Sequence, residues 1–255
     1  MPSSMQHAVG TPAGKAVSQW SGTPREQAVQ RMFTAIATRY DLNNSLLSFG
    51  LHHRWKAIAA RDIPTRTQGR GLDLGTGTGD LALLLHRRMG EHGQTAAIDL
   101  NVAMLKVGAK KIARRGLTGR IACLRVNAEC LVFPDATFDA VTAGFCIRNV
   151  GDRPRAFQEI HRVLKPGGRF VCLEFSRPVS TWLRRLYDWY SFHVLPAIGT
   201  WVASDHTDVY HYLPESIRTF PDQEQLADHL RTAGFTRVHY HNLSGGIVAI
   251  HVADK

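Results

Sequence analysis

Short apolar runs alternate with helical stretches along the middle of the chain, and this alternation is the strongest constraint on its fold. Apolar residues at helical spacing follow the first run, and further helices are expected over 101–115 and 152–164, the last ended by a turn at Lys165–Gly168. Strands separated in this way by helices pair in parallel, with helices on both faces of the sheet. The predicted strands are Arg70–Gly75, Thr95–Leu100, Ile121–Val126, Phe138–Phe145 and Arg169–Phe175.

The end of the chain breaks this alternation. Two late runs, 236–243 and 246–253, are joined through Ser244, Gly245 and Gly246, which leaves no room for a helix, so they must form an antiparallel hairpin. The prediction is an α/β, Rossmann-like fold with a mostly parallel seven-stranded sheet. A parallel sheet closed by such a hairpin matches a class I methyltransferase better than a nicotinamide dehydrogenase, which it disfavours.

The segments before the first strand predict a tail and a helical cap. Residues 1–24 are rich in small and polar residues without periodicity, which indicates a flexible tail. Apolar residues at helical spacing from Val29 to Tyr40, and a second helical stretch from His53 to Arg61, predict an N-terminal cap over 25–64. Residues 25–255 are expected to form one domain, which also carries a substrate-cap insertion at about 178–222.

A glycine-rich turn follows the first predicted strand, with the spacing G-x-G-x-G at Gly75, Gly77 and Gly79. Glycines there let a ligand approach the backbone, and Asp99, at the end of the second strand, can accept both hydroxyls of a ribose. Asn127 and Ala128 follow the third strand, where a loop usually covers an adenine. Alternatives are an ordinary turn for the glycines and for Asn127, and a helix N-cap for Asp99. Together these sites predict an S-adenosylmethionine pocket.

Several longer motifs carry a more specific resemblance. TRYDLNNSLLSFGLHHRW, FCIRNV, RVLKPGGRFVCLEFSRP and YLPESIRTFPDQEQL are similar to segments of the ubiquinone/menaquinone C-methyltransferase family. The resemblance, which runs from about Val29 to the C-terminus, implies transfer of a methyl group from S-adenosylmethionine to a ring carbon of a polyprenyl quinol. It places Thr78 on the cofactor. It aligns Gly144 with a frequent serine, so a side-chain contact is lost there, and Cys146 replaces a glycine, which changes the loop.

The expected chemistry needs a base, or a cation that stabilises an oxyanion, but no metal. Arg148 and Asn149 follow the fourth strand and face the expected methyl-transfer position in this fold; we assign oxyanion stabilisation, or the holding of a proton-shuttling water, to Arg148. Tyr40 and Asp41 in the cap either orient the quinol or simply complete and cap helices. The unperturbed pKa of histidine makes four residues candidate bases: His52, His53, His193 and His206.

The formal net charge of +10 is compatible with nucleic acid, with an anionic membrane, or with a simple bias towards arginine. Nucleic-acid methyltransferases are disfavoured because the fourth strand is followed by GFCIRN, so we expect no nucleic-acid partner. A noncatalytic protein that only binds the cofactor is a further alternative. No signal peptide or membrane span is expected, and the four separated cysteines favour reduced, mostly buried thiols in the cytoplasm.

The segment 182–203 mixes aromatic and aliphatic residues with two arginines, and it predicts either a packed cap helix or a membrane-facing lipid channel. We expect weak peripheral association with the inner face of the membrane, and we count a homodimer or a quinone-biosynthesis assembly among the partners. Demethylmenaquinol is the first choice of substrate, with 2-methoxy-6-polyprenyl-1,4-benzoquinol of ubiquinone biosynthesis as the alternative.

Overall fold

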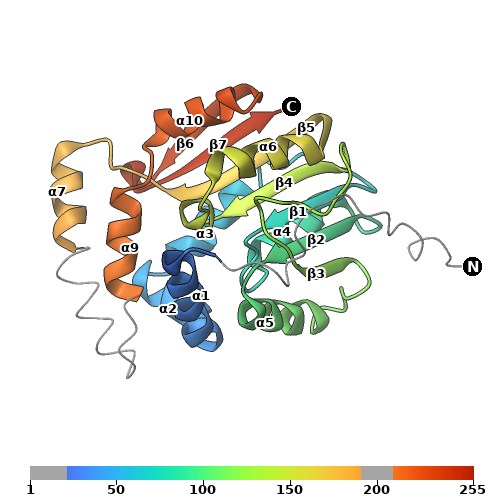
Figure 1. Cartoon of the computed structure of the whole chain (residues 1–255), viewed down its shortest axis with the longest axis horizontal. Coiled ribbons are helices and arrows are strands. Elements are labelled where there is room, and N and C mark those ends of the chain that lie inside the picture. The colour runs from blue at the N-terminus through green and yellow to red at the C-terminus, as the bar shows by residue number, and fades with distance from the viewer. Residues whose placement is uncertain (1–21, 191–208) are drawn as a thin grey trace, which may run out of the picture.

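One seven-stranded sheet forms the centre of the molecule in the computed structural model, which describes residues 22–190 and 209–255 (Figure 1). The strand order is β3-β2-β1-β4-β5-β7-β6. β7 runs antiparallel to both of its neighbours and every other neighbouring pair is parallel, which confirms the predicted sheet and hairpin. The strands are β1 Arg70–Leu74, β2 Gln94–Asp99, β3 Ile121–Arg125, β4 Phe138–Gly144, β5 Leu164–Phe175, β6 Thr236–Leu243 and β7 Val248–Asp254.

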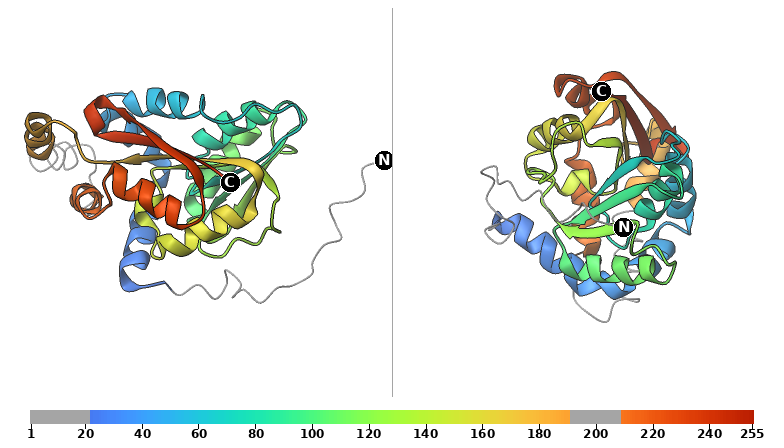
Figure 2. Two further views of the ribbon diagram at one scale, coloured as in Figure 1. Left: turned by 90° about the horizontal axis from the view of Figure 1, so that it is seen from above. Right: turned by 90° about the vertical axis from the view of Figure 1, so that its right-hand side faces the viewer.

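Helices cover both faces of the sheet (Figure 2). On one face, α3 (Leu51–Ala59) and α4 (Asp80–Met89) bury Trp55 and Leu85 against β4, β5 and β7, and α5 (Val102–Ala113) packs beside α4. On the other face, α6 (Arg153–Val163) and α10 (Gln223–Thr232) bury Phe157 and Leu230 in the largest apolar cluster. Because the parallel strands are buried on both faces, they read in the sequence as short apolar runs.

The cap consists of more helices than the apolar pattern predicts. α1 (Pro24–Ile36) begins with a capping box between Thr23 and Glu26, a 3-10 turn follows, and α2 (Tyr40–Leu47) precedes α3. Gly50, with φ of 75°, turns the chain between α2 and α3. Towards the other end of the chain lie α7 (Thr181–Trp189) and α9 (Val209–Arg218), which Figure 1 shows on the same side of the sheet as the cap.

Two local expectations need correction. The turn predicted at Lys165–Gly168 lies inside β5, as an irregularity between the pairs Leu164–Phe138 and Arg169–Ala140, because the strand begins directly where α6 ends. Of the four cysteines, which are all free thiols, Cys172 alone is buried and the other three are half-buried.

Other expectations fall partly outside the described residues. The tail residues 1–21, and the segment 191–208 with His193 and His206, cannot be compared with the structure. The proposed division into tail, cap and insertion therefore stays a prediction. Among the helices of the described residues, none is both long and apolar enough to cross a membrane.

Candidate active site

The glycine-rich turn leaves β1 at the edge of the sheet where the parallel strands end. Gly75 and Gly77 have φ angles of 56° and 55°, in the left-handed region that favours glycine. A Cβ atom on Gly75 would collide with the side chain of Cys146, so this position needs glycine for space as well as for conformation. The backbone N–H of Gly77 donates to Asp99 Oδ2 at 2.9 Å, which joins the turn to the end of β2.

Asp99 is held by backbone donors and lines a cleft with both glycines. Its Oδ1 accepts the N–H of Asn101 at 2.8 Å, and burial raises its pKa. Asn101 is the residue that caps α5, because its side chain accepts the N–H of Met104. The alternative interpretation of Asp99 as the N-cap of this helix is therefore wrong.

The same cleft collects most of the residues expected to bind the cofactor. Asn127, Ala128 and Gly144 line it together with Asn149. Asn127 Oδ1 also accepts the N–H of Glu129 at 3.0 Å, so it is a turn residue as well as a wall of the cleft. The sequence gives no sign of the opposite wall, which α1 supplies through Val29, Gln30 and Phe33. The capping box and the apolar stripe predict α1, but they do not say where it docks.

Thr78 has a different partner from the one that the family resemblance implies. Its side chain is buried, and its hydroxyl donates to Asp41 Oδ1 of α2 at 2.6 Å. Thr78 is absent from the cleft walls of the described residues. Gly75 and Gly77 of the turn line the cleft, whereas the side chain of Thr78 contacts the cap.

A buried ion pair lies next to the cleft. Arg148 Nη1 donates to Glu174 Oε1 at 2.9 Å and to the carbonyl of Phe145 at 2.6 Å, and the side chains of Arg148 and Glu174 are 7% and 1% exposed. Burial, the largest single effect, would lower the pKa of Arg148, but the charge and hydrogen bond of Glu174 together with Tyr40 and Tyr212 outweigh it, and the pKa is raised. Sequence reasoning missed Glu174, although a charged residue inside the apolar run of β5 was a visible signal.

A second, larger cavity of about 410 Å³ lies beside the cleft. Arg148 lines it, and its other walls are mostly aromatic and aliphatic side chains from α1, α2, α3 and α7. Phe33, Tyr40 and Phe145 line both the cavity and the cleft, so they mark the place where the two meet. Tyr40 is enclosed enough that burial raises its pKa. Asn149, on the cleft side, accepts the hydroxyl of Tyr212 at 2.8 Å.

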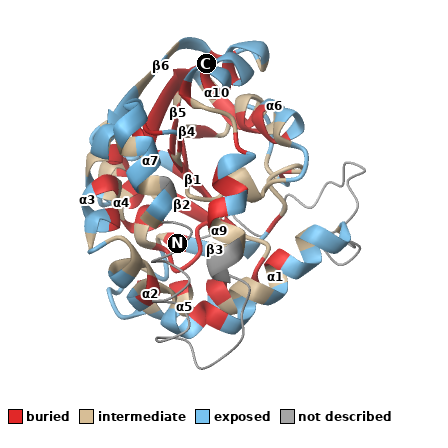
Figure 3. Ribbon diagram, turned by 90° about the vertical axis from the view of Figure 1, so that its left-hand side faces the viewer, coloured by how far each residue is buried: buried red, intermediate tan, exposed pale blue. Residues whose placement is uncertain are grey.

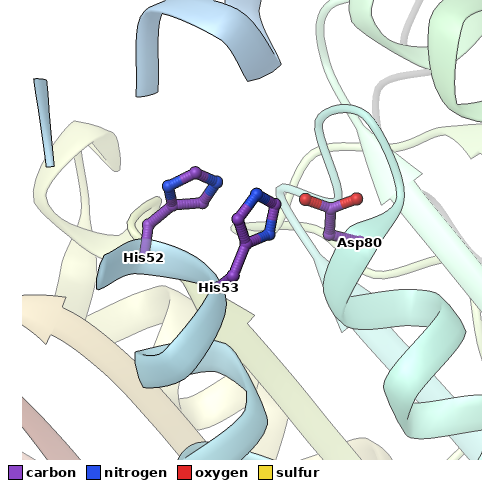
Figure 4. A group of neighbouring side chains, drawn as sticks. All are labelled: His52, His53 and Asp80. Carbon is purple, nitrogen blue, oxygen red and sulfur yellow. The ribbon is translucent and has the colours of Figure 1, made fainter. Parts of the chain in front are cut away.

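The histidines of α3 lie beside the acid that begins α4, as Figure 4 shows for His52, His53 and Asp80. One possible ligand atom from each of the three residues lies within 4.8 Å of the other two, which suits a metal ion by distance. Both carboxylate oxygens of Asp80 already accept ammonium groups, from Lys111 at 2.7 Å and Lys56 at 2.9 Å. The two lysine charges oppose a cation at this position, so the cluster is better explained as part of an ion-pair network.

His52 and His53 differ in environment. His52 is buried, and burial together with the charge of Lys56 lowers its pKa to about 4, so it is neutral at physiological pH. One of its ring nitrogens pairs with Ser48 Oγ at 2.9 Å. His53 is exposed and contacts the ring of His52, with ring centroids 3.9 Å apart and the rings tilted by 39°.

Residues 22–255 match the ubiE/COQ5 methyltransferase family. The chain belongs to this family. It is 46% identical over 231 residues to the ubiquinone/menaquinone biosynthesis C-methyltransferase UbiE of Legionella pneumophila strain Paris, covering 91% of this chain and 92% of that protein. It is 48% identical, with the same coverage of both chains, to the protein of that name from Pectobacterium carotovorum subsp. carotovorum strain PC1.

Solved structures support the fold of this family member. A SAM-dependent methyltransferase from Aquifex aeolicus matches with a TM-score of 0.62 at 18% identity, covering 87% of this chain and 97% of that one. A phosphoethanolamine N-methyltransferase 2 from Haemonchus contortus matches with a TM-score of 0.65 at 16% identity, covering 92% and 60%. At these identities the likeness concerns the fold alone.

The protein is therefore an S-adenosylmethionine-dependent methyltransferase. The cleft fits such a cofactor in two respects. The carboxylate of Asp99 offers an acceptor at the end of β2, and two glycines without side chains leave the backbone of the turn open to a ligand.

Proposed function

We propose that this protein transfers a methyl group from S-adenosylmethionine to a ring carbon of polyprenyl quinols, in both menaquinone and ubiquinone biosynthesis. The observation that carries the proposal is the apolar cavity of about 410 Å³, which shares three aromatic walls with the cofactor cleft and holds a buried arginine. Its size lies in the range of small-molecule sites, and its walls suit an aromatic ring with an isoprenoid tail. The relatives' names, which join ubiquinone and menaquinone, support both substrates over demethylmenaquinol alone.

For the cofactor, we assign the ribose hydroxyls to Asp99 and the adenine edge to the loop of Asn127 and Ala128. Gly75 and Gly77 would let the amino-acid part of the cofactor approach the backbone, and Gly144 leaves room at the end of β4. The support is that all of these residues line one cleft. When bound, S-adenosylmethionine supplies a methyl group carried on a positively charged sulfur.

The role of the chain's own residues follows from what the quinol needs. A ring carbon becomes nucleophilic when a hydroxyl of the quinol loses its proton, so a fixed positive charge near that oxygen favours the reactive form. Arg148 offers such a charge in the cavity, and its raised pKa makes it a poor base but a permanent cation. We assign Tyr40 and Asn149 to orienting the ring, or a water that carries the proton, at the junction of cavity and cleft.

The mouth of the cavity supports the expected peripheral association with a membrane. Of the large apolar side chains that are exposed in the described residues, eight lie in two segments, 42–51 and 179–189. The ring of Phe49, 76% exposed, lies 6.4 Å from that of Tyr190, which brings the two segments together on the side seen in Figure 3. Exposed Arg184 and Arg185 add positive charge there. A polyprenyl substrate resides in the bilayer, so we propose that this side docks on the inner, anionic face of the membrane.

The membrane proposal is tested by flotation of the full chain with vesicles at low salt. Phe49→Ser and Trp182→Ser are expected to reduce flotation with anionic vesicles, while Val132→Ser, at an exposed apolar position outside both segments, is the matched control. Equal flotation of all variants would contradict the proposed face. The expected homodimer or assembly with other enzymes stays a prediction.

The catalytic proposal is tested with labelled S-adenosylmethionine and short-chain forms of both quinols. Transfer to both quinols is expected from the wild-type protein, and Arg148→Ala is expected to lose about a hundredfold or more in kcat while still binding S-adenosylhomocysteine. If the wild-type protein methylates neither quinol, the proposed function is refuted. Undiminished turnover by a folded Arg148→Ala protein would remove the role of Arg148. Extracts of cells that lack the gene identify the physiological substrate through the demethylated quinone that accumulates.

A further inference from the structure

A hydrogen bond ties the substrate cap to the glycine-rich turn. The hydroxyl of Thr78, in the turn, donates to Asp41 Oδ1, in α2, at 2.6 Å. The other oxygen of Asp41 accepts the ammonium group of Lys111, in α5, at 2.6 Å. Thr78 is 3% exposed, so its hydroxyl has little access to water as an alternative partner. Neither Thr78 nor Asp41 takes part in the proposed methyl transfer.

The link is one member of a chain of alternating charges. From Asp41 the chain passes through Lys111 to Asp80 at 2.7 Å, and from Asp80 to Lys56 of α3 at 2.9 Å. Burial would lower the pKa of Lys111, but Asp41 and Asp80 outweigh burial and the pKa is raised. Burial would raise the pKa of Asp80, but the two lysines outweigh burial and lower it. These shifts keep Lys111 and Asp80 charged at physiological pH. The network joins α2, α3, α4, α5 and the turn.

The two ends of the Thr78–Asp41 bond belong to two different sites. Gly75 and Gly77, in the turn of Thr78, line the cofactor cleft. α2 and α3 supply much of the wall of the apolar cavity. Tyr40, which precedes Asp41 in the chain, lines both. Any shift of Asp41 relative to the turn therefore shifts Tyr40 at the junction of the two sites.

We infer that Asp41 is a positioning residue that couples the binding of the cofactor to the binding of the quinol. A cofactor that orders the turn holds α2 and Tyr40 in place for the quinol, and the quinol strengthens cofactor binding in return. This inference rests on the proposed function, because it takes the quinol as the ligand of the cavity. The coupling must be reciprocal, since both ligands bias the same contact. A charge-assisted hydrogen bond is strong enough to supply a coupling of about tenfold.

The test measures the affinity of the full chain for S-adenosylhomocysteine with and without a saturating short-chain demethylmenaquinol under reducing conditions. The quinol is expected to tighten binding by about tenfold in the wild-type protein. Thr78→Val, which replaces the hydroxyl by a methyl group of similar size, is expected to reduce this factor to within about twofold of one. Thr78→Ser keeps a hydroxyl and is expected to restore the coupling.

Thr95→Val is the matched control. Thr95 is also 3% exposed, and among the described residues its hydroxyl has no partner, so the same substitution is expected to leave the coupling factor unchanged. A Thr78→Val protein that couples the ligands as the wild type does would overturn the inference alone. A wild-type protein that binds S-adenosylhomocysteine but neither binds nor methylates the quinol would overturn the proposed function, and the inference with it. A loss of coupling in Thr95→Val as well would overturn the inference, because the effect would then follow from any buried threonine change.

Discussion

Replacing Glu174 by glutamine should weaken both the fold and the reaction, because it removes the partner of a buried cation. The carboxylate of Glu174 accepts Arg148 Nη1 at 2.9 Å, and it also accepts the backbone N–H of Phe175 at 2.9 Å and that of Arg148 at 3.2 Å. With the two side chains 7% and 1% exposed, water cannot compensate for the lost charge. Glutamine keeps the shape and one acceptor oxygen, but it loses the charge and presents an N–H2 group where the second carboxylate oxygen accepts a hydrogen bond.

The expected loss can be worked from this burial. Removing one partner of a buried ion pair costs about 3 to 5 kcal/mol. Glutamine retains part of the hydrogen bonding, so a loss of about 3 kcal/mol in the free energy of unfolding is expected, equivalent to a fall in Tm of about 6 to 12 °C for a chain of this size. If Arg148 is then held less firmly in the cavity, kcat should fall by about tenfold or more, while the affinity for S-adenosylhomocysteine changes little because Glu174 does not line the cleft.

Asp254→Asn is the matched control for this prediction. Asp254 accepts two hydrogen bonds from Arg169, which lies at the opposite end of β5, and the arginine side chain is 34% exposed. Asp254 itself is only 5% exposed, but the arginine that the substitution leaves behind is open to water. The change should therefore cost less stability than Glu174→Gln, and it should leave kcat unchanged. The two variants are compared by urea unfolding and by methyl transfer. If Glu174→Gln unfolds like the wild type and keeps its turnover, the buried pair neither stabilises the fold nor positions Arg148, and the reasoning fails.

Three further predictions concern single side chains. Asp99→Ala should weaken S-adenosylhomocysteine binding by about tenfold to a hundredfold in calorimetry, because it removes a charged acceptor from the cleft; unchanged affinity would contradict its assignment to the ribose. Burial lowers the pKa of His251 to about 4, so between pH 6.5 and 4 the unfolded chain binds more protons than the folded one, and stability falls as the pH falls. From pH 7 to 5 the free energy of unfolding, measured with urea, should fall by about 2 kcal/mol more in the wild type than in His251→Gln. Burial raises the pKa of Asp73 to about 6, so between pH 4 and 6 the folded chain holds a proton that the unfolded chain has lost. The free energy of unfolding therefore falls as the pH rises from 4 through 6. Asp73→Asn should unfold at a higher urea concentration than the wild type at pH 8 but not at pH 4.

The fold was predictable because its signals are local. Apolar runs of strand length, separated by helical stretches, specify parallel strands, and the short link at Ser244–Gly246 specifies the antiparallel hairpin. The glycine-rich turn and Asp99 were predictable for the same reason, since each follows a strand whose carboxyl end lies at one edge of the sheet.

The remaining features depend on contacts between distant parts of the chain. Thr78 and Asp41 are 37 residues apart, and Arg148 and Glu174 are 26 apart. Neither pair has a spacing that a helix or a hairpin imposes, so only the docking of the cap and the pairing of β4 with β5 bring them together. The wall that α1 forms over the cleft has the same origin, because an amphipathic pattern specifies a helix and its buried face but not its neighbour.

The burial of the cavity also limits which groups can change charge during the reaction. Glu174, together with Tyr40 and Tyr212, holds the pKa of Arg148 above its ordinary value, so this side chain stays charged between pH 6 and 9. Burial raises the pKa of Tyr40, which stays protonated, and lowers that of His52 to about 4, which stays neutral above pH 5. Between pH 6 and 9 these three cavity residues therefore keep one protonation state each. A rate that rises with pH over this range would then not report the titration of any of these three residues. We expect it to report the ionisation of the quinol hydroxyl, because the fixed charge of Arg148 acts on that oxygen.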